Sequence, residues 1–366
     1  MTKQVELRSI VFKGINQVEL ETKPKMFMLG PRDVLIQTLY SCISAGTEVA
    51  KLSGLQKVSY PLHLGNRAVG HVVATGTDAD HVAIGDLVFS HIHHQSHSLG
   101  QQLVCPLPNE LEKPIAAMLG MALVAMTGVQ TSHLELGDTV VVTGGGLVGQ
   151  FAAQLAALSG AYPILIDIID ERLQTARLCG ISTTINPTKE DANARVMELT
   201  DNKGADTILE CTGVPAVATS AVNYARRSGR FVFVGSPRGE CQTNITPFLE
   251  KVHLWKPGGD LTLLGAHEWK IPIKENDFTK HSMEQNCRLL SRLMIENKLK
   301  AAPLVSRVYN PENATEAYQD LINHQNEVLG AIFDWRSHQD KNLKSSKFKP
   351  NTVSYTHLTL PTSDLV

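Results

Sequence analysis

The feature that most constrains the fold is a glycine-rich turn between an apolar strand and a helix. The segment "VVVTGGGLVGQ" puts Gly144, Gly146 and Gly149 in a G-x-G-x-x-G pattern. The first glycine permits a tight turn, the second lets a pyrophosphate approach the backbone, and the third lets the helix pack closely on the strand. The helix that opens with Leu147 and Val148 offers free N–H groups and the positive end of its dipole to phosphates. These five residues are therefore predicted to bind a dinucleotide cofactor.

The alternation of strand and helix continues beyond this turn. Four apolar runs read as buried strands, "YPILIDII", "ADTILECTG", "RFVFVGS" and "DLTLLGAH", and two segments read as helices, "DERLQTARLCG" and "VPAVATSAVNYARRSG". Continuous apolar runs are typical of buried parallel strands, and their spacing here is that of βαβ units. The sequence therefore predicts an α/β fold with a doubly wound parallel sheet, in which Gly160 ends the first helix.

The first part of the chain has a different pattern. Up to about residue 115, short apolar or alternating runs such as "DVLIQTLYSCIS" and "RAVGHVVATG" are broken by Gly, Asp and Pro, which is typical of a small β-rich domain. A helical stretch, "PIAAMLGMALVAMTGVQTSH", follows. Near the other end, "EVLGAIFDW" reads as a strand that closes the fold at Trp335.

Composition excludes several classes of partner. The 366 residues carry a net charge of -2, so no charge-driven attraction to nucleic acid or to an acidic membrane is expected. The N-terminus lacks the apolar core of a signal peptide, and the longest apolar run, "MALVAMTGVQ", is too short to cross a bilayer. The 6 cysteines form no C-x-x-C pair, which argues against disulfides and favours a cytoplasmic setting.

An acidic residue follows the glycine turn at the distance expected for ribose recognition. Asp167 ends the next predicted strand, 18 residues after Gly149. A carboxylate there binds a ribose hydroxyl and repels a 2′-phosphate, which predicts NAD as the cofactor and not NADP. Arg172 could soften that preference. The alternative is that the glycines only shape a turn and that Asp167 only caps a helix.

Several motifs in one order resemble the medium-chain dehydrogenase/reductase family, which includes the zinc alcohol and polyol dehydrogenases. They are "SAGTE", "PLHLGNRAVGHVVATG", "GDLVF", "GDTVVVTGGGLVGQ", "LIDIIDERLQTAR", "GADTILECTG" and "GRFVFVGSPRGE", and they extend over about residues 5–335. The resemblance implies a GroES-like catalytic domain over residues 1–115, a Rossmann NAD-binding domain over 116–268 and a return to the catalytic domain over 269–335. The polar residues 336–366 are then a disordered or non-native tail.

The resemblance also implies further cofactor contacts and an assembly. Thr212, Gly235 and Ser236 would line the nicotinamide and ribose side of the cleft, where the carboxyl ends of parallel strands face a ligand. The alternative is that they are only turn residues at strand ends. Neighbouring Rossmann sheets often pair in this family, so a homo-oligomer, either a dimer or a tetramer, is expected.

The resemblance implies a zinc site, but its ligands are replaced here. Zinc members of the family use a cysteine where this chain has Ala45, and a His-Glu step where it has Asn66 and Arg67. Zinc needs thiolate, imidazole or carboxylate donors, and an arginine opposes a dication. We therefore predict no metal site. Cys42 could be a displaced ligand, but a core cysteine is the alternative that we favour.

Without a metal, side chains must remove the alcohol proton and stabilise the alkoxide-like transition state. Thr47 matches the proton-relay hydroxyl of the family. Arg67 or Asn66 could stabilise negative charge on the substrate oxygen. Glu48 could orient the substrate or act as a base, and the alternative for Glu48 is a structural hydrogen bond to backbone in a tight turn.

A histidine-rich segment, "SHIHHQSHSLGQ", offers another base. Its four histidines are His91, His93, His94 and His97. They could supply a base to the cleft, bind a metal, or lie in a solvated loop. For a catalytic base we choose His97 first and His93 second.

Together these observations predict an NAD-dependent oxidoreductase that interconverts a secondary alcohol and a ketone without catalytic zinc. A sugar, polyol or glycoside substrate fits the polar side chains expected in the cleft. The alternatives are a metal-free reductase of a C=C or tetrapyrrole-type substrate, and a catalytically inactive nucleotide-binding protein.

Overall fold

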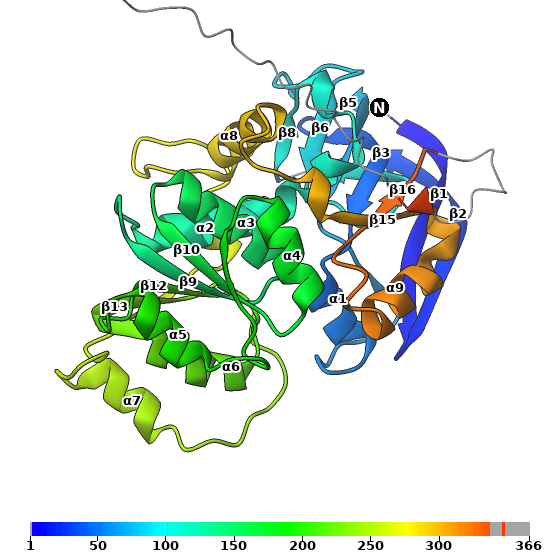
Figure 1. Ribbon diagram of the computed structural model, residues 1–366. Coiled ribbons are helices and arrows are strands. Elements are labelled where there is room, and N and C mark those ends of the chain that lie inside the picture. The colour runs from blue at the N-terminus through cyan, green and yellow to red at the C-terminus, as the bar shows by residue number, and fades with distance from the viewer. Residues whose placement is uncertain (1, 101, 337–345, 348–366) are drawn as a thin grey trace, which may run out of the picture.

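The computed structural model describes residues 2–100, 102–336 and 346–347. Figure 1 shows two lobes, a β-rich lobe that contains the N-terminal strands and an α/β lobe formed by the middle of the chain. The last part of the chain returns to the β-rich lobe, where its helix α9 lies beside strand β2. The predicted combination of a GroES-like domain and a Rossmann domain is confirmed.

The α/β lobe is built on a six-stranded parallel sheet in the order β11-β10-β9-β12-β13-β14. After β9 the chain forms β10 and β11 on one side of this strand, and then β12, β13 and β14 on the other side. The order therefore reverses between β9 and β12, and the carboxyl ends of these strands form the crevice in which such sheets bind ligands. The strands are β9 (Thr139–Thr143), β10 (Tyr162–Ile166), β11 (Thr183–Ile185), β12 (Ala205–Glu210), β13 (Ala225–Phe233) and β14 (Thr262–Gly265).

Helices cover both faces of this sheet (Figure 1). After α3, Gly160 takes a positive φ of 88°, so the predicted helix stop is confirmed. The predicted helix "VPAVATSAVNYARRSG" is too long, because Ala225 already pairs with Ala205 of β12 and begins β13. The helices of this lobe are α3 (Leu147–Leu158), α4 (Asp170–Leu178), α5 (Ala192–Leu199), α6 (Pro215–Ala221), α7 (Thr246–His253) and the 3₁₀ turns η3 (Val222–Tyr224) and η4 (Glu268–Lys270).

The helical stretch predicted after the first domain is present, and as a membrane candidate it is longer than the apolar run "MALVAMTGVQ". The 3₁₀ turn η2 (Pro114–Met118) runs directly into α2 (Leu119–Ser132). Together they make 19 residues, long and apolar enough to cross a membrane, in contrast to the shorter run seen in the sequence. However, 83% of this helix is buried inside the protein, where it packs between the sheet and α8 (Met283–Ile295), so it serves as a core helix.

The β-rich lobe contains a three-stranded and an eight-stranded sheet. The first has the order β2-β1-β4, and the second has the order β17-β15-β16-β3-β5-β6-β8, with β7 paired to β3. As predicted, the strand before Trp335 closes the fold, because β16 pairs antiparallel with β3. The strands are β1 (Thr2–Gly14), β2 (Gln17–Met28), β3 (Val34–Cys42), β4 (Leu62–His63), β5 (Ala68–Thr75), β6 (Leu87–Ser90), β7 (His97–Gly100), β8 (Val104–Pro106), β15 (Val305–Tyr309), β16 (Gly330–Asp334) and β17 (Ser346–Lys347).

Two helices of this lobe matter for the site. α1 (Ala45–Leu52) was not predicted, since this part of the chain was interpreted as a small β-rich domain, and α9 (Ala314–Asn323) packs against it. The shorter 3₁₀ turns are η1 (Asn109–Leu111), η5 (Ala302–Leu304) and η6 (Pro311–Asn313). Of the predicted tail 336–366, residues 337–345 and 348–366 lie outside the described residues.

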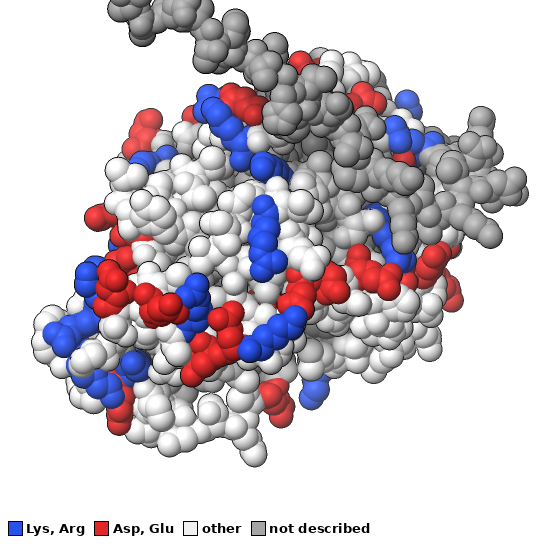
Figure 2. Space-filling view, in the orientation of Figure 1, with Lys and Arg blue, Asp and Glu red and all other residues white. Residues whose placement is uncertain are grey.

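The surface carries no large field of one charge on the face seen in Figure 2. Lys and Arg alternate there with Asp and Glu, and uncharged surface lies between them. This mixture agrees with the small net charge of -2. It offers no extended basic footprint of the kind that a polyanion would need.

The glycine turn allows a test of whether the close contact between Gly149 and Gly144 requires glycine. A Cβ added to Gly149 would overlap the carbonyl oxygen of Gly144, which is backbone and cannot rotate away. We expect Gly149→Ala to lower the free energy of unfolding by about 1–3 kcal/mol, measured by urea denaturation. Gly146→Ala is the matched control, because its added Cβ meets no atom within 4 Å and its φ of -67° suits any residue. Equal stability of the two variants would contradict this account of the turn.

Candidate functional site

The glycine loop forms an open cradle at the carboxyl end of β9. Gly144 has a φ of 92°, which favours glycine, and its Cα faces Thr212, whose Cγ2 would lie 2.8 Å from an added Cβ. Gly146 is the first residue before α3, and the space above it is empty. Leu147 and Val148 form the first turn of α3, where N–H groups have no partner inside the helix. The cradle fits the phosphates of a dinucleotide.

Asp167 orders this loop and places a negative charge beside it. Its Oδ2 accepts a hydrogen bond from the N–H of Gly145 at 2.6 Å, and its Oδ1 accepts one from Ile169 at 2.8 Å. Nη1 of Arg172 lies 3.6 Å from the same carboxylate. Gln150 donates to the carbonyls of Gly145 and Arg172 and so joins the loop to α4. Asp167 therefore supports the loop through these hydrogen bonds, and its contact with a ribose stays a prediction.

The predicted nicotinamide side lies at the neighbouring strand ends. Glu210, at the end of β12, accepts hydrogen bonds from the N–H groups of Thr212 and Gly213 and from the Thr212 hydroxyl. Burial raises the pKa of Glu210. A Cβ on Gly235 would overlap the N–H of Gly213, so the turns after β12 and β13 touch. The structure thus brings Thr212, Gly235 and Ser236 together beside the glycine loop.

Glu48 has a different environment from the one expected of a substrate ligand. It is 2% exposed, and its carboxylate accepts hydrogen bonds from the N–H of Ser44 (2.7 Å) and the hydroxyl of Tyr318 (2.5 Å). Nε2 of His94 lies 3.1 Å from it, and Nδ1 of His94 reaches the Ser41 hydroxyl at 2.7 Å. Burial would raise the pKa of Glu48, but the charge and hydrogen bond of His94, with those of Tyr318 and Ser44, bring it below its usual value. Glu48 therefore fixes the first turn of α1.

A buried ion pair occupies the segment where zinc ligands would be expected. Nη2 of Arg67 donates to Oε2 of Glu268 at 2.9 Å, and Nη1 donates to the side chain of Asn66. Arg67 is 4% exposed, and its Nε is buried without an acceptor. Arg67 precedes β5 in the β-rich lobe, whereas Glu268 follows β14 in the α/β lobe, so the pair bridges the two lobes.

His91 lies beside this pair. Its ring packs edge-on against Phe89 at 5.8 Å and against Trp269 at 5.2 Å between ring centres. Burial lowers the pKa of His91 to about 4; Glu268 raises it and Arg67 lowers it by smaller amounts. The ring is therefore neutral at neutral pH. Both of its nitrogens are buried without a hydrogen-bond partner.

The other predicted catalytic residues are placed less centrally. His97 lies in β7 opposite Gln37, at the end of β3 remote from Cys42, so the structure does not bring it to Arg67. Nδ1 of the exposed His93 contacts the carbonyl of Gly65 at 2.7 Å. Thr47 lies in the first turn of α1 and is half-buried.

Glu268 was missed from the sequence, and His91 was named among the four histidines but was not chosen as a base. Glu268 is separated from Arg67 by 201 positions, and no local pattern announces the pairing. His91 had a usable signal, because it directly follows the "GDLVF" strand that the family resemblance places at the cleft. Within the histidine segment, His94 belongs to the buried network of Glu48 and not to a solvated loop.

The donors present do not fit a zinc ion. A guanidinium carries only N–H donors, and Ala45 offers no ligand atom. In residues 2–100 and 102–336, no three of His, Cys, Asp and Glu form a group that could hold a metal. Cys42 is fully buried in the core of the lobe, and burial raises its pKa to about 12, so it is a neutral thiol.

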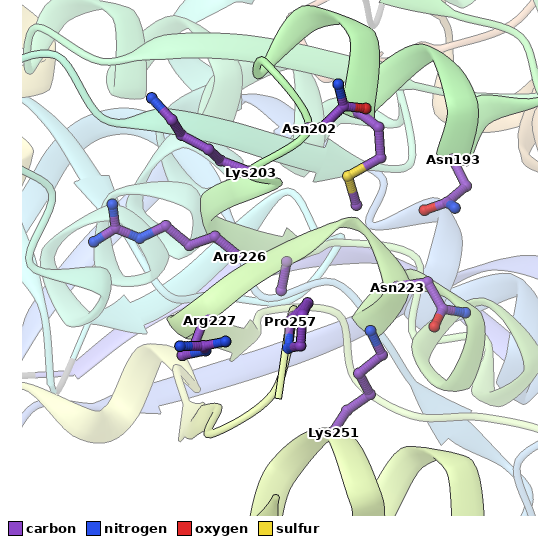
Figure 3. A pocket seen from close by; sticks show the side chains of 11 residues that line it. Asn193, Asn202, Lys203, Asn223, Arg226, Arg227, Lys251 and Pro257 are labelled. Carbon is purple, nitrogen blue, oxygen red and sulfur yellow. The ribbon is translucent and has the colours of Figure 1, made fainter. Parts of the chain in front are cut away.

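A separate cavity lies at the opposite ends of the strands from the glycine loop. It has a volume of about 550 Å³ and opens at the amino ends of β12 and β13. Figure 3 shows that Lys203 and Arg226 extend away from Lys251, and Arg226 is paired with Asp206 at 2.7 Å. Its cationic side chains therefore do not converge, and the cavity contains no built anion site.

Comparison with known proteins gives the context of this geometry. A family model described as "Alcohol dehydrogenase GroES-like domain" matches residues 30–134, and one described as "Zinc-binding dehydrogenase" matches residues 148–256. Sorbitol dehydrogenase of Halalkalibacterium halodurans is 25% identical over 84% of this chain and 93% of its own length. D-guloside 3-dehydrogenase of Escherichia coli is 26% identical over 72% of this chain and 75% of its own. The crystal structure of galactitol-1-phosphate dehydrogenase from Escherichia coli superposes with a TM-score of 0.76 and 19% identity, over 89% of this chain and 99% of its own.

The depressed pKa of His91 predicts a pH dependence of stability. The folded protein keeps this ring neutral down to about pH 4, whereas the unfolded chain binds a proton below its ordinary value of 6.5. Stability contributed by the neutral ring is complete above 6.5 and is lost as the pH falls toward 4. Between about pH 7 and pH 4.5, the free energy of unfolding of the natural chain should fall by roughly 2 kcal/mol more than that of His91→Gln, as measured by urea denaturation.

The control for this measurement is His81→Gln, since His81 is exposed on the surface. It should leave the pH profile of the natural chain unchanged. If His91→Gln and the natural chain lose the same stability over this pH interval, then His91 is not held neutral by its surroundings.

Proposed function

The chain belongs to the medium-chain dehydrogenase/reductase superfamily, and we propose that it is an NAD-dependent oxidoreductase that works without catalytic zinc. Its class of reaction is that of the alcohol dehydrogenases, which act on a CH–OH group. The substrate that we propose is a secondary alcohol of a sugar, polyol or glycoside, which is converted to a ketone. Relatives named as sorbitol and D-guloside dehydrogenases support this substrate class.

The observation that carries the proposal is the buried Arg67–Glu268 pair between the two lobes. A positive group in this place can stabilise the negative charge that develops on the substrate oxygen when its proton leaves. Such preorganised donors act strongly because water is excluded from them. The bound nicotinamide supplies the acceptor for the hydride.

The remaining residues have separate roles in the proposed reaction. His91, neutral and with both nitrogens unpaired, orients the alcohol by accepting its hydrogen bond, since a ring with a pKa of about 4 is a weak base. The Thr47 hydroxyl positions the substrate and relays the proton, and Asn66 orients the guanidinium of Arg67. Glu268 keeps Arg67 in place, and Glu48 acts through the position of α1 and not by touching substrate.

NAD is the proposed cofactor because of Asp167. Its carboxylate lies beside the glycine loop, where a 2′-phosphate would be repelled. We also propose a cytoplasmic homo-oligomer. All 6 cysteines are free thiols, which suits a reducing compartment, and β14 leaves one edge of the Rossmann sheet available to a second copy.

The first test is turnover after chelation of metal ions. We expect reduction of NAD with at least one member of a panel of sugars, methyl glycosides and polyols, and we expect the rate to resist chelators. Activity that is lost on chelation and restored by zinc would contradict the metal-free mechanism. Silence across the panel, with NAD still binding, would contradict the proposed substrate class and favour an inactive nucleotide-binding protein.

Within this assay, Arg67→Gln should reduce kcat by about 10²–10³-fold, the typical loss for one donor that stabilises an oxyanion. Arg8→Gln is the matched control. Arg8 is also a buried arginine with a carboxylate partner, Glu312, but it lies in β1, away from the cleft. A similar loss in both variants would assign Arg67 a purely structural role.

Cofactor choice gives a second test. Asp167→Asn keeps an acceptor for the N–H of Gly145 but removes the negative charge beside Arg172. We expect this variant to bind NADPH about 10-fold more tightly, which corresponds to about 1.4 kcal/mol in a fluorescence titration. Adding Arg172→Gln should cancel the gain. An unchanged NADPH affinity in Asp167→Asn would show that this carboxylate does not select the cofactor.

A further inference from the structure

Arg238 places a positive charge in the crevice between the lobes, close to the backbone of both. It follows β13 in the segment "VGSPRGE". A Cβ added to Gly46 of α1 would overlap its Nη1, and one added to Gly213 would lie 3.2 Å from its Nη2. Nε donates to the carbonyl of Ser236 at 3.2 Å. No carboxylate in the described part of the chain lies within 4 Å of this guanidinium.

The group that faces Arg238 is also positive. Gly46 is the second residue of α1, and the side chain of Ser44 does not cap this helix. The N–H groups of Thr47 and Glu48 turn back to the carbonyl of Ser44, whereas those of Ala45 and Gly46 have no acceptor among the described residues. A helix N-terminus carries about half a positive charge. Burial lowers the pKa of Arg238 and the charge of Glu210 raises it, and the Glu48 carboxylate lies in the same turn of α1, so part of this positive charge is already compensated. The guanidinium and the N–H groups of Ala45 and Gly46 still face the same space, and an anion placed between them would interact favourably with both.

The crevice leads from this point to the phosphate cradle. Gly213 follows Thr212, and the side chain of Thr212 lies against Gly144 of the glycine loop. A dinucleotide that crosses from the cradle at β9 to the turns after β12 and β13 must pass beside Arg238. Its pyrophosphate is the part that carries negative charge.

We propose that Arg238 and the first turn of α1 together hold the pyrophosphate of the dinucleotide and thereby join the two lobes around it. This inference rests on the proposed function, since it requires the chain to bind a nicotinamide dinucleotide. It adds a binding residue from the turn after β13 and assigns to Gly46 the role of making room for the guanidinium.

The test is a set of binding titrations with the full chain and no substrate. Arg238→Gln should weaken both ADP and NADH by about 10-fold or more, as expected for loss of a charge-assisted hydrogen bond to phosphate, and should leave adenosine binding unchanged. Arg238→Lys should recover part of the loss. The matched control is Arg227→Gln, because that guanidinium lies over the ring of Trp255, at the opposite edge of the sheet.

Each outcome decides between defined alternatives. Equal affinities of the natural chain and Arg238→Gln for ADP and NADH would overturn the inference. Loss for NADH but not for ADP would also overturn it, because the contact would then be to the nicotinamide half. A natural chain that binds no NADH would contradict the proposed function itself.

A thermal unfolding scan of the ligand-free variants separates a structural role. If Arg238 serves the pyrophosphate, Arg238→Gln should unfold at the same temperature as the natural chain or higher, because it removes a charge from the helix N-terminus. A lower unfolding temperature without ligand, with unchanged ligand affinities, would assign Arg238 to stability alone and overturn the inference.

Discussion

A carboxylate without access to water determines much of the β-rich lobe. Burial of an ion costs several kcal/mol unless hydrogen bonds compensate for it, and the Glu48 carboxylate has such partners in Ser44, His94 and Tyr318. These partners come from three distant parts of the chain. The network therefore fixes the start of α1 relative to the histidine segment and to α9. The positions of Gly46 and Thr47 in the crevice follow from it.

The second constraint is that the site is assembled from two lobes. Arg67 and His91 belong to the β-rich lobe, whereas Glu268, Trp269 and Arg238 belong to the α/β lobe. Where the family resemblance implies a metal, this chain has a guanidinium with its counter-charge, and it cannot serve as a zinc ligand. The proposed chemistry still requires a positive charge beside the substrate oxygen. The guanidinium of Arg67 supplies this charge in place of a zinc ion. The assignments of family, fold and class of reaction do not depend on this replacement of the zinc site by a guanidinium. The zinc-free mechanism does depend on it.

The sequence predicted the parts of the structure that depend on local pattern. The strand, glycine loop and helix around Gly144–Gly149 and the presence of a parallel sheet follow from apolar runs and turn residues. Helix α1 was missed because Gly46 and Thr47 are common turn residues, and its stability comes from Glu48 and its distant partners. The helix after Val214 was predicted too long because pairing of β13 with β12 overrides local propensity.

The site residues were harder to predict. Glu268 was not predictable, since only the folded chain brings it to Arg67. The choice of His97 and then His93 as the base stays a prediction, and the packing of His91 between Phe89 and Trp269 could not be inferred from the sequence, because Trp269 lies far away along the chain.

The bridge between Arg67 and Glu268 has a consequence for the rate at which the protein can work. Any separation of the lobes that admits substrate or releases product must break this pair, and both charges must then be hydrated before they can part. Opening is thus opposed by the attraction that prepares the site for reaction. In such an arrangement the slow step of a cycle shifts from bond breaking toward release. Solutes that hydrate or screen these two charges would then control how often the crevice opens, without any contact with the substrate.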